Sequence, residues 1–315
     1  MVDDDGASCR SVATRSRCMS LLSPYLPEDF DSFWAEAAQE ARDAPLDFHR
    51  APQHDVVLAG FNIERIAFRS VLGTALYGWI AYPPHSRRLP SFVWIPPYGR
   101  ESLLPNAYGT RQGMTSLSFN FHGEDAFHQE PYVPARGYFS EGAGDPETWI
   151  FRSMLQNCLI AARVLEAQVE ADEDRIGAMG LSQGAGLAIW TGAFSNVVKA
   201  VCADMPFLSA MRQTFSLPIY RYPLKELTDF MDTIPIGRER VMNTVSYFDT
   251  VNMATHCAKP TQVSLGLKDP SCRPQNVEAV FEALPAKKNL IKYDWGHDWG
   301  LPMIENNRRW LLENL

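Results

Sequence analysis

Hydrophobic residues near the start of the chain recur with the period of a helix. After Pro27-Glu28-Asp29 they stand at i, i+3, i+4, i+7, i+8 and i+11, as Phe30, Phe33, Trp34, Ala37, Ala38 and Ala41. These spacings lie on one face of a helix, so the segment is predicted to be an amphipathic helix. The pattern then changes. Residues 62–70 and 74–83 are extended segments separated by Gly73, which predicts a β-hairpin.

The rest of the chain alternates between short apolar runs and longer helical patterns. Strands are predicted at residues 91–96, 114–121, 174–182, 197–204, 261–269 and 288–295. Helices are predicted from Asp145-Pro146 to Leu165, at 184–194, 223–232, 237–249 and 274–284, and at the C-terminus. Nearly continuous apolar strands alternating with helices are typical of a parallel sheet covered on both faces.

This alternation, without an internal repeat or a low-complexity linker, predicts one α/β domain. We expect a mostly parallel central sheet over residues 21–315, with an N-terminal helical extension and an insertion around residues 205–250. Residues 1–20 are polar and lack the apolar core of a signal peptide, so we expect a disordered tail there.

The net charge bears on the class of binding partner, and the cysteine content bears on the cellular compartment. With 29 Lys plus Arg and 37 Asp plus Glu, the net charge of −8 argues against nucleic acid or an anionic membrane as the main partner. No apolar run approaches the ~18 residues needed to span a bilayer. The six cysteines are scattered without C-x-x-C spacing, which favours reduced thiols in a cytoplasmic protein; a Cys9–Cys18 bridge is the alternative.

The strongest chemical signal is Gly180-Leu181-Ser182-Gln183-Gly184, a G-x-S-x-G between a predicted buried strand and a helix. A sharp strand-to-helix turn strains the serine backbone, and glycines two residues to either side avoid clashes. The turn lifts the hydroxyl above the sheet edge. Ser182 is therefore the predicted nucleophile; the alternative is a structural glycine turn.

A serine nucleophile needs a base to accept its proton and an acid to orient that base. In strand-turn-helix hydrolases these follow in the order Ser, Asp or Glu, His. Asp269 and His297 each come directly after a predicted strand, so we expect the triad Ser182, Asp269 and His297. Asp294 and Asp298 are competing acids, but a side chain so close in sequence rarely faces the ring.

The oxyanion of the reaction needs two donors already in place. The Gln183 N–H follows the nucleophile. The second is expected in Pro96-Pro97-Tyr98-Gly99, where Tyr98 is the first residue after the prolines with an N–H; the alternative is a rigid turn in which Tyr98 only packs.

Together these residues resemble carbohydrate esterase family 7, the acetyl xylan esterases and cephalosporin C deacetylases of the α/β-hydrolase fold. The likeness runs from about Leu21 to the C-terminus. It is carried by the segments LPEDFDSFWAEAAQEAR, RGYFSEGAGDPETWIFR, DEDRIGAMGLSQGAGLAIW, VKAVCADMPFL, GLKDPSCRP and WGHDWG. The resemblance implies the same triad and oxyanion donors, and a homo-oligomer, a hexamer in the family. The serine mechanism itself requires no cofactor.

Two positions depart from the family pattern. The family's Arg-Gly-Gln is here His122-Gly123-Glu124, which leaves substrate choice open. Its His-Gly-Tyr-Gly is here Pro96-Pro97-Tyr98-Gly99, which keeps the donor at Tyr98.

The expected function is hydrolysis of small acyl esters, above all acetyl groups on sugars or related alcohols. The alternatives are a carboxylesterase, lipase or peptidase with another preference, a non-catalytic binding protein, and a metal-dependent hydrolase. A metal site would use the segment from His122 to Glu130, which holds His122, Glu124, Asp125, His128 and Glu130.

Aromatic residues suggest the substrate contacts. Trp295 and Trp299 flank His297 and either line its pocket or only pack. Phe207, a further predicted contact, belongs with Tyr220, Tyr222 and Phe230 to a candidate lid.

Overall fold

The computed structural model describes residues 25–99, 104–121, 123, 125–127, 137–234 and 237–315. The tail predicted for residues 1–20 lies outside the described residues. Within them a nine-stranded sheet has the order β1-β2-β3-β5-β4-β6-β7-β8-β9. Its strands are β1 (Phe48–Pro52), β2 (Asn62–Arg69), β3 (Ala75–Tyr82), β4 (Leu89–Ile95), β5 (Thr115–Phe119), β6 (Ala171–Leu181), β7 (Ala200–Asp204), β8 (Thr261–Gly266) and β9 (Lys288–Tyr293).

The sheet has an antiparallel part and a parallel part. β1, β2, β3 and β5 pair antiparallel in that order, and the predicted hairpin is confirmed as β2 and β3, with Ile66 opposite Gly78. From β5 through β4, β6, β7 and β8 to β9 every pairing is parallel. Parallel strands end at one edge, so the loops after β4, β6, β7, β8 and β9 meet there. The predicted fold class, α/β with a mostly parallel sheet, is confirmed.

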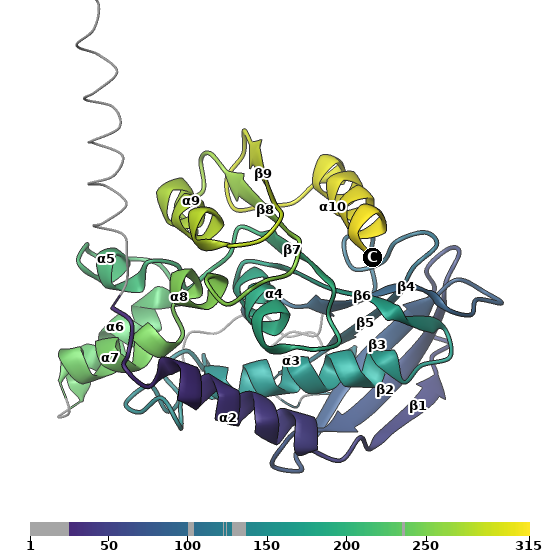
Figure 1. Cartoon of the computed structure of the whole chain (residues 1–315), viewed down its shortest axis with the longest axis horizontal. Helices are drawn as coiled ribbons and strands as arrows, with labels where there is room; N and C mark the ends of the chain where they lie inside the picture. The colour runs from purple at the N-terminus through teal and green to yellow at the C-terminus, as the bar shows by residue number, and fades with distance from the viewer. Residues whose placement is uncertain (1–24, 100–103, 122, 124, 128–136, 235–236) are drawn as a thin grey trace, which may run out of the picture.

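Helices cover both faces of this sheet (Figure 1). They are α2 (Phe30–Asp43), α3 (Ile150–Glu166), α4 (Gln183–Phe194), α5 (Met211–Phe215), α6 (Leu224–Thr233), α7 (Arg238–Tyr247), α8 (Thr250–Ala254), α9 (Pro274–Ala283) and α10 (Leu301–Asn314). Helices α5 to α8 fall between β7 and β8; α5, α6 and α7 lie in the segment predicted as an insertion, and α8 begins where that segment ends. No helix of the described segments is long and apolar enough to cross a bilayer.

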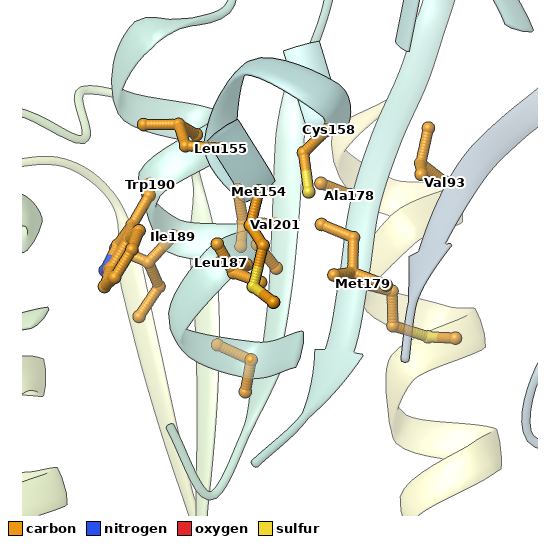
Figure 2. Close-up of a cluster of buried hydrophobic side chains, with 14 of the residues drawn as sticks. Val93, Met154, Leu155, Cys158, Ala178, Met179, Leu187, Ile189, Trp190 and Val201 are labelled. Atoms are coloured by element: carbon orange, nitrogen blue, oxygen red, sulfur yellow. The ribbon is translucent and has the colours of Figure 1, made fainter. Parts of the chain in front are cut away.

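Strand β6 shows how the two faces are filled. Successive strand residues point to opposite faces. Ala178 faces the cluster formed by α3 and α4, which contains Met154, Cys158 and Leu187, whereas Met179 points to the other side (Figure 2). There the Asn307 amide of α10 donates to the Met179 sulfur at 3.8 Å. The strand that leads to Ser182 is therefore packed from both sides.

Helix α2 confirms the predicted amphipathic helix. Its buried residues are Phe30, Phe33, Trp34, Ala37, Ala38 and Ala41, the six positions of the predicted stripe. This stripe packs on α3, where the Arg152 guanidinium binds Glu40 at 2.9 Å.

The start of α3 differs from the prediction. The helix begins at Ile150 and not at Asp145-Pro146. Asp145 accepts from the Glu147 N–H (2.9 Å), and its carbonyl accepts from the N–H groups of Thr148 and Trp149, which forms a separate turn. Trp149 is extended (ψ 128°), and its indole N–H donates to the Phe139 carbonyl at 2.9 Å. Asp145 therefore does accept backbone N–H groups as a helix cap would, but these N–H groups belong to a turn that ends before the helix begins.

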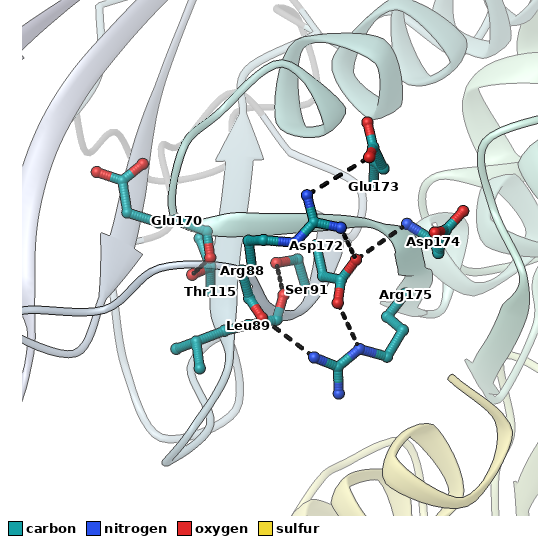
Figure 3. A network of polar contacts seen from close by, with 9 residues as sticks. All are labelled: Arg88, Leu89, Ser91, Thr115, Glu170, Asp172, Glu173, Asp174 and Arg175. Carbon is teal, nitrogen blue, oxygen red and sulfur yellow. Dashed lines mark hydrogen bonds and ion pairs between the residues drawn. The ribbon is translucent and has the colours of Figure 1, made fainter.

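At the opposite edge of the sheet, charged residues join the beginnings of β4 and β6 (Figure 3). Asp172 accepts from Arg88 at 3.1 Å and from Arg175 at 2.8 Å, and Arg175 also donates to the Arg88 carbonyl. The hydrogen bond from Arg175 lowers the pKa of Asp172. This network fixes the start of β6, at the opposite end of the strand from Ser182.

Candidate active site

Ser182 stands at the turn between β6 and α4 with a left-handed backbone (φ 58°, ψ −118°). A Cβ added to Gly180 would lie 2.3 Å from the Gly184 carbonyl carbon, and one added to Gly184 would lie 2.0 Å from the Ile95 oxygen. Both positions therefore require glycine. The Ser182 N–H donates to the Asp204 carbonyl, and the Ser182 carbonyl accepts from the Phe207 N–H (3.0 Å), so neighbouring segments hold the strained turn.

Asp269 and His297 are brought together from two different loops. Asp269 follows β8, His297 follows β9, and the Nδ1 atom of His297 lies 2.7 Å from Oδ2 of Asp269. The Asp269 side chain is fully buried, and 27% of the His297 side chain is exposed. Oδ1 of Asp269 accepts from the N–H groups of Ser271 (2.8 Å) and Cys272 (2.9 Å). A carboxylate fixed in this way orients the ring and leaves Nε2 for chemistry.

The two competing acids have other partners. The Asp294 carboxylate pairs with Lys268 at 2.9 Å, and Asp298 accepts from the Trp299 N–H at 2.7 Å.

A buried thiol that the sequence reasoning missed lies between Ser182 and the Asp269–His297 pair. Burial and the Asp269 charge raise the pKa of Cys272, and a hydrogen bond with the Ser182 side chain lowers it. Ligand atoms of Asp269, Cys272 and His297 all lie within 4.8 Å of one another. Between Ser182 and His297, both of them described, there is no hydrogen bond in this conformation. Such contacts are often long in the absence of substrate.

The same three residues are also a possible set of ligands for a metal ion. A thiol, an imidazole and a carboxylate are ligand types that zinc accepts. In this structure, however, the His297 Nδ1 and the Asp269 carboxylate already bond to each other. His122, Glu124, His128 and Glu130, four residues of the predicted alternative metal site, lie outside the described residues.

The two predicted oxyanion donors are linked through Tyr138. Gln183 is the first residue of α4, so its backbone N–H has no acceptor within the helix. Its side-chain amide donates to the Tyr138 hydroxyl (3.1 Å), which also accepts from the Gly99 N–H (3.2 Å). The Tyr98 ring packs on the Tyr138 ring, with 4.6 Å between centroids. The loop after β4 and the turn of Ser182 are thus held together.

Comparison with known proteins shows the family of this chain. The family model for acetyl xylan esterase matches residues 22–313. The chain belongs to the acetyl xylan esterase family. Among solved structures, the acetyl xylan esterase from Paenibacillus sp. R4 has a TM-score of 0.83 and 27% identity, covering 95% of this chain and 99% of that one. Acetyl xylan esterase 1 from Thermoanaerobacterium sp. JW/SL YS485 shares the fold, with a TM-score of 0.83, 24% identity and coverage of 95% and 98%.

A relative of known activity is longer than this chain. Acetyl esterase Axe7A of Xylanibacter ruminicola (strain ATCC 19189 / DSM 19721 / CIP 105475 / JCM 8958 / 23) is 24% identical over 292 residues, which are 89% of this chain. The chain spans 65% of that relative's length. The predicted resemblance to this esterase family is confirmed.

In this member of the acetyl xylan esterase family, a carboxylate of α6 reaches the loop after β4. The Tyr98 hydroxyl donates to Glu226 of α6, and the Phe139 N–H donates to the same carboxylate at 3.0 Å. Neither Glu226 nor Tyr138 was found from the sequence as a site residue. Their contacts join segments far apart in the chain, and no spacing encodes them.

The predicted aromatic contacts differ in their surroundings. The Trp295 ring stacks on Tyr293, with centroids 4.2 Å apart and planes 8° from parallel. Trp299 is 41% exposed and lies against Tyr108, 5.5 Å between centroids. Phe207 is buried (5% exposed). A substrate role for these three residues stays a prediction.

Proposed function

We propose that this chain is a serine esterase that removes acetyl groups from sugars or related alcohols. The observation that carries the proposal is the 2.7 Å hydrogen bond between His297 and the buried Asp269, beside the strained turn of Ser182. Membership of the acetyl xylan esterase family supports the acyl group and the class of alcohol.

The proposed reaction has two halves. The Ser182 oxygen attacks the ester carbonyl while Nε2 of His297 takes the hydroxyl proton, and Asp269 stabilises the imidazolium. Backbone N–H groups of Gln183 and Tyr98 bind the oxyanion. His297 then gives the proton to the departing alcohol, which leaves an acetyl-enzyme. Water, deprotonated by His297, cleaves that ester, and acetate leaves as the proton returns to Ser182.

Two further expectations accompany this proposal. The family resemblance implies a homo-oligomer, and the cysteine pattern implies a cytoplasmic location. Both stay predictions.

The decisive experiment is Ser182→Ala, with steady-state rates on 4-nitrophenyl acetate, butyrate and octanoate and on acetylated xylo-oligosaccharides and cephalosporin C. We expect kcat to fall by ~10⁴ or more with unchanged folding, because the oxygen nucleophile is gone. Ser32→Ala is a matched control, since this exposed hydroxyl only donates to the Asp29 carbonyl.

Two results would contradict the proposal. Turnover that survives in the Ser182→Ala variant would remove the nucleophile from the mechanism. If a chelator abolished that remaining activity, the metal-dependent alternative would replace it.

A further inference from the structure

A cavity of about 140 Å³ lies beside the proposed catalytic residues, between the insertion and the loop after β8. Phe207, Tyr220 and Tyr222 line it from one side and Ser271 and Arg273 from the other. It does not touch Ser182 or His297 directly. Two of its lining residues do contact the site, because the Phe207 N–H donates to the Ser182 carbonyl and the Ser271 N–H donates to the Asp269 carboxylate.

The size of the cavity fits one ring rather than an acetyl group. A buried cavity of ~150 Å³ is known to hold a benzene-sized molecule, and an acetyl group has only three heavy atoms. The lining includes Tyr220, 81% exposed, and Tyr222, 40% exposed. Aromatic side chains offer apolar faces and polar edges. The cavity therefore suits the alcohol part of an ester, with the acetyl group left at Ser182.

Two guanidinium groups give this cavity a positive charge. Arg221 and Arg273 line it, and none of the described side chains that line it is a carboxylate. Neither guanidinium has a hydrogen bond or ion pair to a described residue. Other arginines of the insertion do have acceptors, since Arg212 binds Glu239 and Arg238 binds the Phe215 carbonyl, each at 2.9 Å. In a chain of net charge −8, two uncompensated cations in one cavity are an unusual local feature.

We propose that this cavity binds the ring of the alcohol part and that Arg221 and Arg273 select acetyl esters whose ring carries a carboxylate. An acetylated acidic sugar is the substrate class that fits. The inference rests on the proposed esterase function and names the substrate of that site. Guanidinium groups bind carboxylates through paired N–H donors, so they discriminate a carboxylate from a neutral amide of the same shape.

Two matched pairs of substrates test this selectivity. Acetylated glucuronic acid is compared with acetylated glucuronamide, and 4-acetoxybenzoate with 4-acetoxybenzamide. We expect kcat/KM of the wild type to favour the acidic sugar over its amide by about 10-fold or more, the usual range for a hydrogen bond to a charged group. In Arg221→Ala/Arg273→Ala the preference disappears, because kcat/KM falls by about 10-fold more for the acid than for the neutral amide.

A control variant separates this effect from a general loss of charge. Arg87 is exposed on the connection between β3 and β4, at the edge of the sheet away from the site. Arg87→Ala removes one positive charge and keeps the full preference. Circular dichroism compares the folding of all variants. The wild-type preference shrinks as ionic strength rises, because salt screens partly exposed charges.

Several results would overturn the inference. These are a wild type without preference for the acid, or a double variant that retains it. If the preference appears only with the benzoate pair, the cavity binds carboxylates but not acidic sugars, and the substrate class is wrong. Turnover that survives Ser182→Ala instead overturns the proposed function. Binding of glucuronic acid without an ester, compared with glucuronamide by calorimetry, then still tests the two arginines.

Discussion

Two buried carboxylates stand at the same edge of the sheet, Asp204 at the end of β7 and Asp269 just after β8. Asp269 accepts two backbone N–H groups and the His297 ring. Asp204 accepts from the Ser264 hydroxyl (2.6 Å), the Tyr108 hydroxyl (2.7 Å) and the Asn307 amide (2.6 Å). Both are shielded from water, so burial alone does not distinguish them. Their partners do.

The partner decides what a buried carboxylate does. Asp269 faces the imidazole of His297, whose side chain is partly exposed. The donors of Asp204 are neutral, and they tie β7 to β8, to the segment of Tyr108 and to α10. Burial raises the pKa of Asp204, and the hydrogen bonds lower it in part. We infer that Asp269 serves catalysis and Asp204 serves the fold.

The largest expected effect is that of Asp269→Asn on activity. An amide cannot stabilise an imidazolium and favours the wrong ring tautomer, so kcat should fall by ~10⁴. The oxygen of the new side-chain amide can still accept from the N–H groups of Ser271 and Cys272, so the free energy of unfolding should change by only about 1 kcal/mol. Steady-state kinetics and urea denaturation measure the two quantities. A variant with nearly full kcat would show that His297 works without this acid.

The second effect is that of Asp204→Ala on stability. Removing the carboxylate leaves three buried donors without an acceptor, which should lower the free energy of unfolding by about 3–5 kcal/mol. The kcat of the folded enzyme should stay within about 10-fold of the wild type. Asp204→Asn is the matched control, because the amide keeps an acceptor oxygen and donates to the Ser264 hydroxyl. If Asp204→Ala instead lost kcat as Asp269→Asn should, without loss of stability, the division of roles would be wrong.

The sequence predicted those parts of the molecule that depend on local pattern. The stripe of α2, the β2–β3 hairpin and the parallel strands follow from periodicity. The turn of Ser182 follows from two glycines that have no room for a Cβ. The order of strands then brings Asp269 and His297 to one edge, although they are 28 residues apart.

Contacts between distant segments were beyond this reasoning. Cys272 beside Ser182 and Glu226 beside Tyr98 depend on how the insertion and the loops fold back, and no period or motif marks them. The short edge strand β1 (Phe48–Pro52) was missed because half-buried residues and a terminal proline hide the alternation. Asp145 has the residue type of a helix cap, but it caps a separate turn, and α3 begins only at Ile150.

A third buried carboxylate, that of Asp249, has a different kind of partner from Asp269 and Asp204. It accepts only backbone N–H groups, from Ala210 (3.0 Å), Met211 (2.6 Å) and Val251 (3.0 Å). Burial raises its pKa to about 6, which outweighs these three bonds. The folded state therefore holds a proton that the unfolded chain has already released between pH ~4 and ~6.

A raised pKa on an acid stabilises the fold at low pH, and this stabilisation is lost as the pH rises through about 6. The free energy of unfolding of the wild type, minus that of Asp249→Asn, should consequently fall by about 3 kcal/mol between pH 4 and pH 7. The subtraction removes the other titrating groups, so chemical denaturation of the two proteins at several pH values isolates this carboxyl. Parallel curves would mean that the three N–H groups hold Asp249 ionised throughout. Burial would then not be enough to shift the pKa of this carboxyl, and its three N–H partners would offset the whole cost of removing its charge from water.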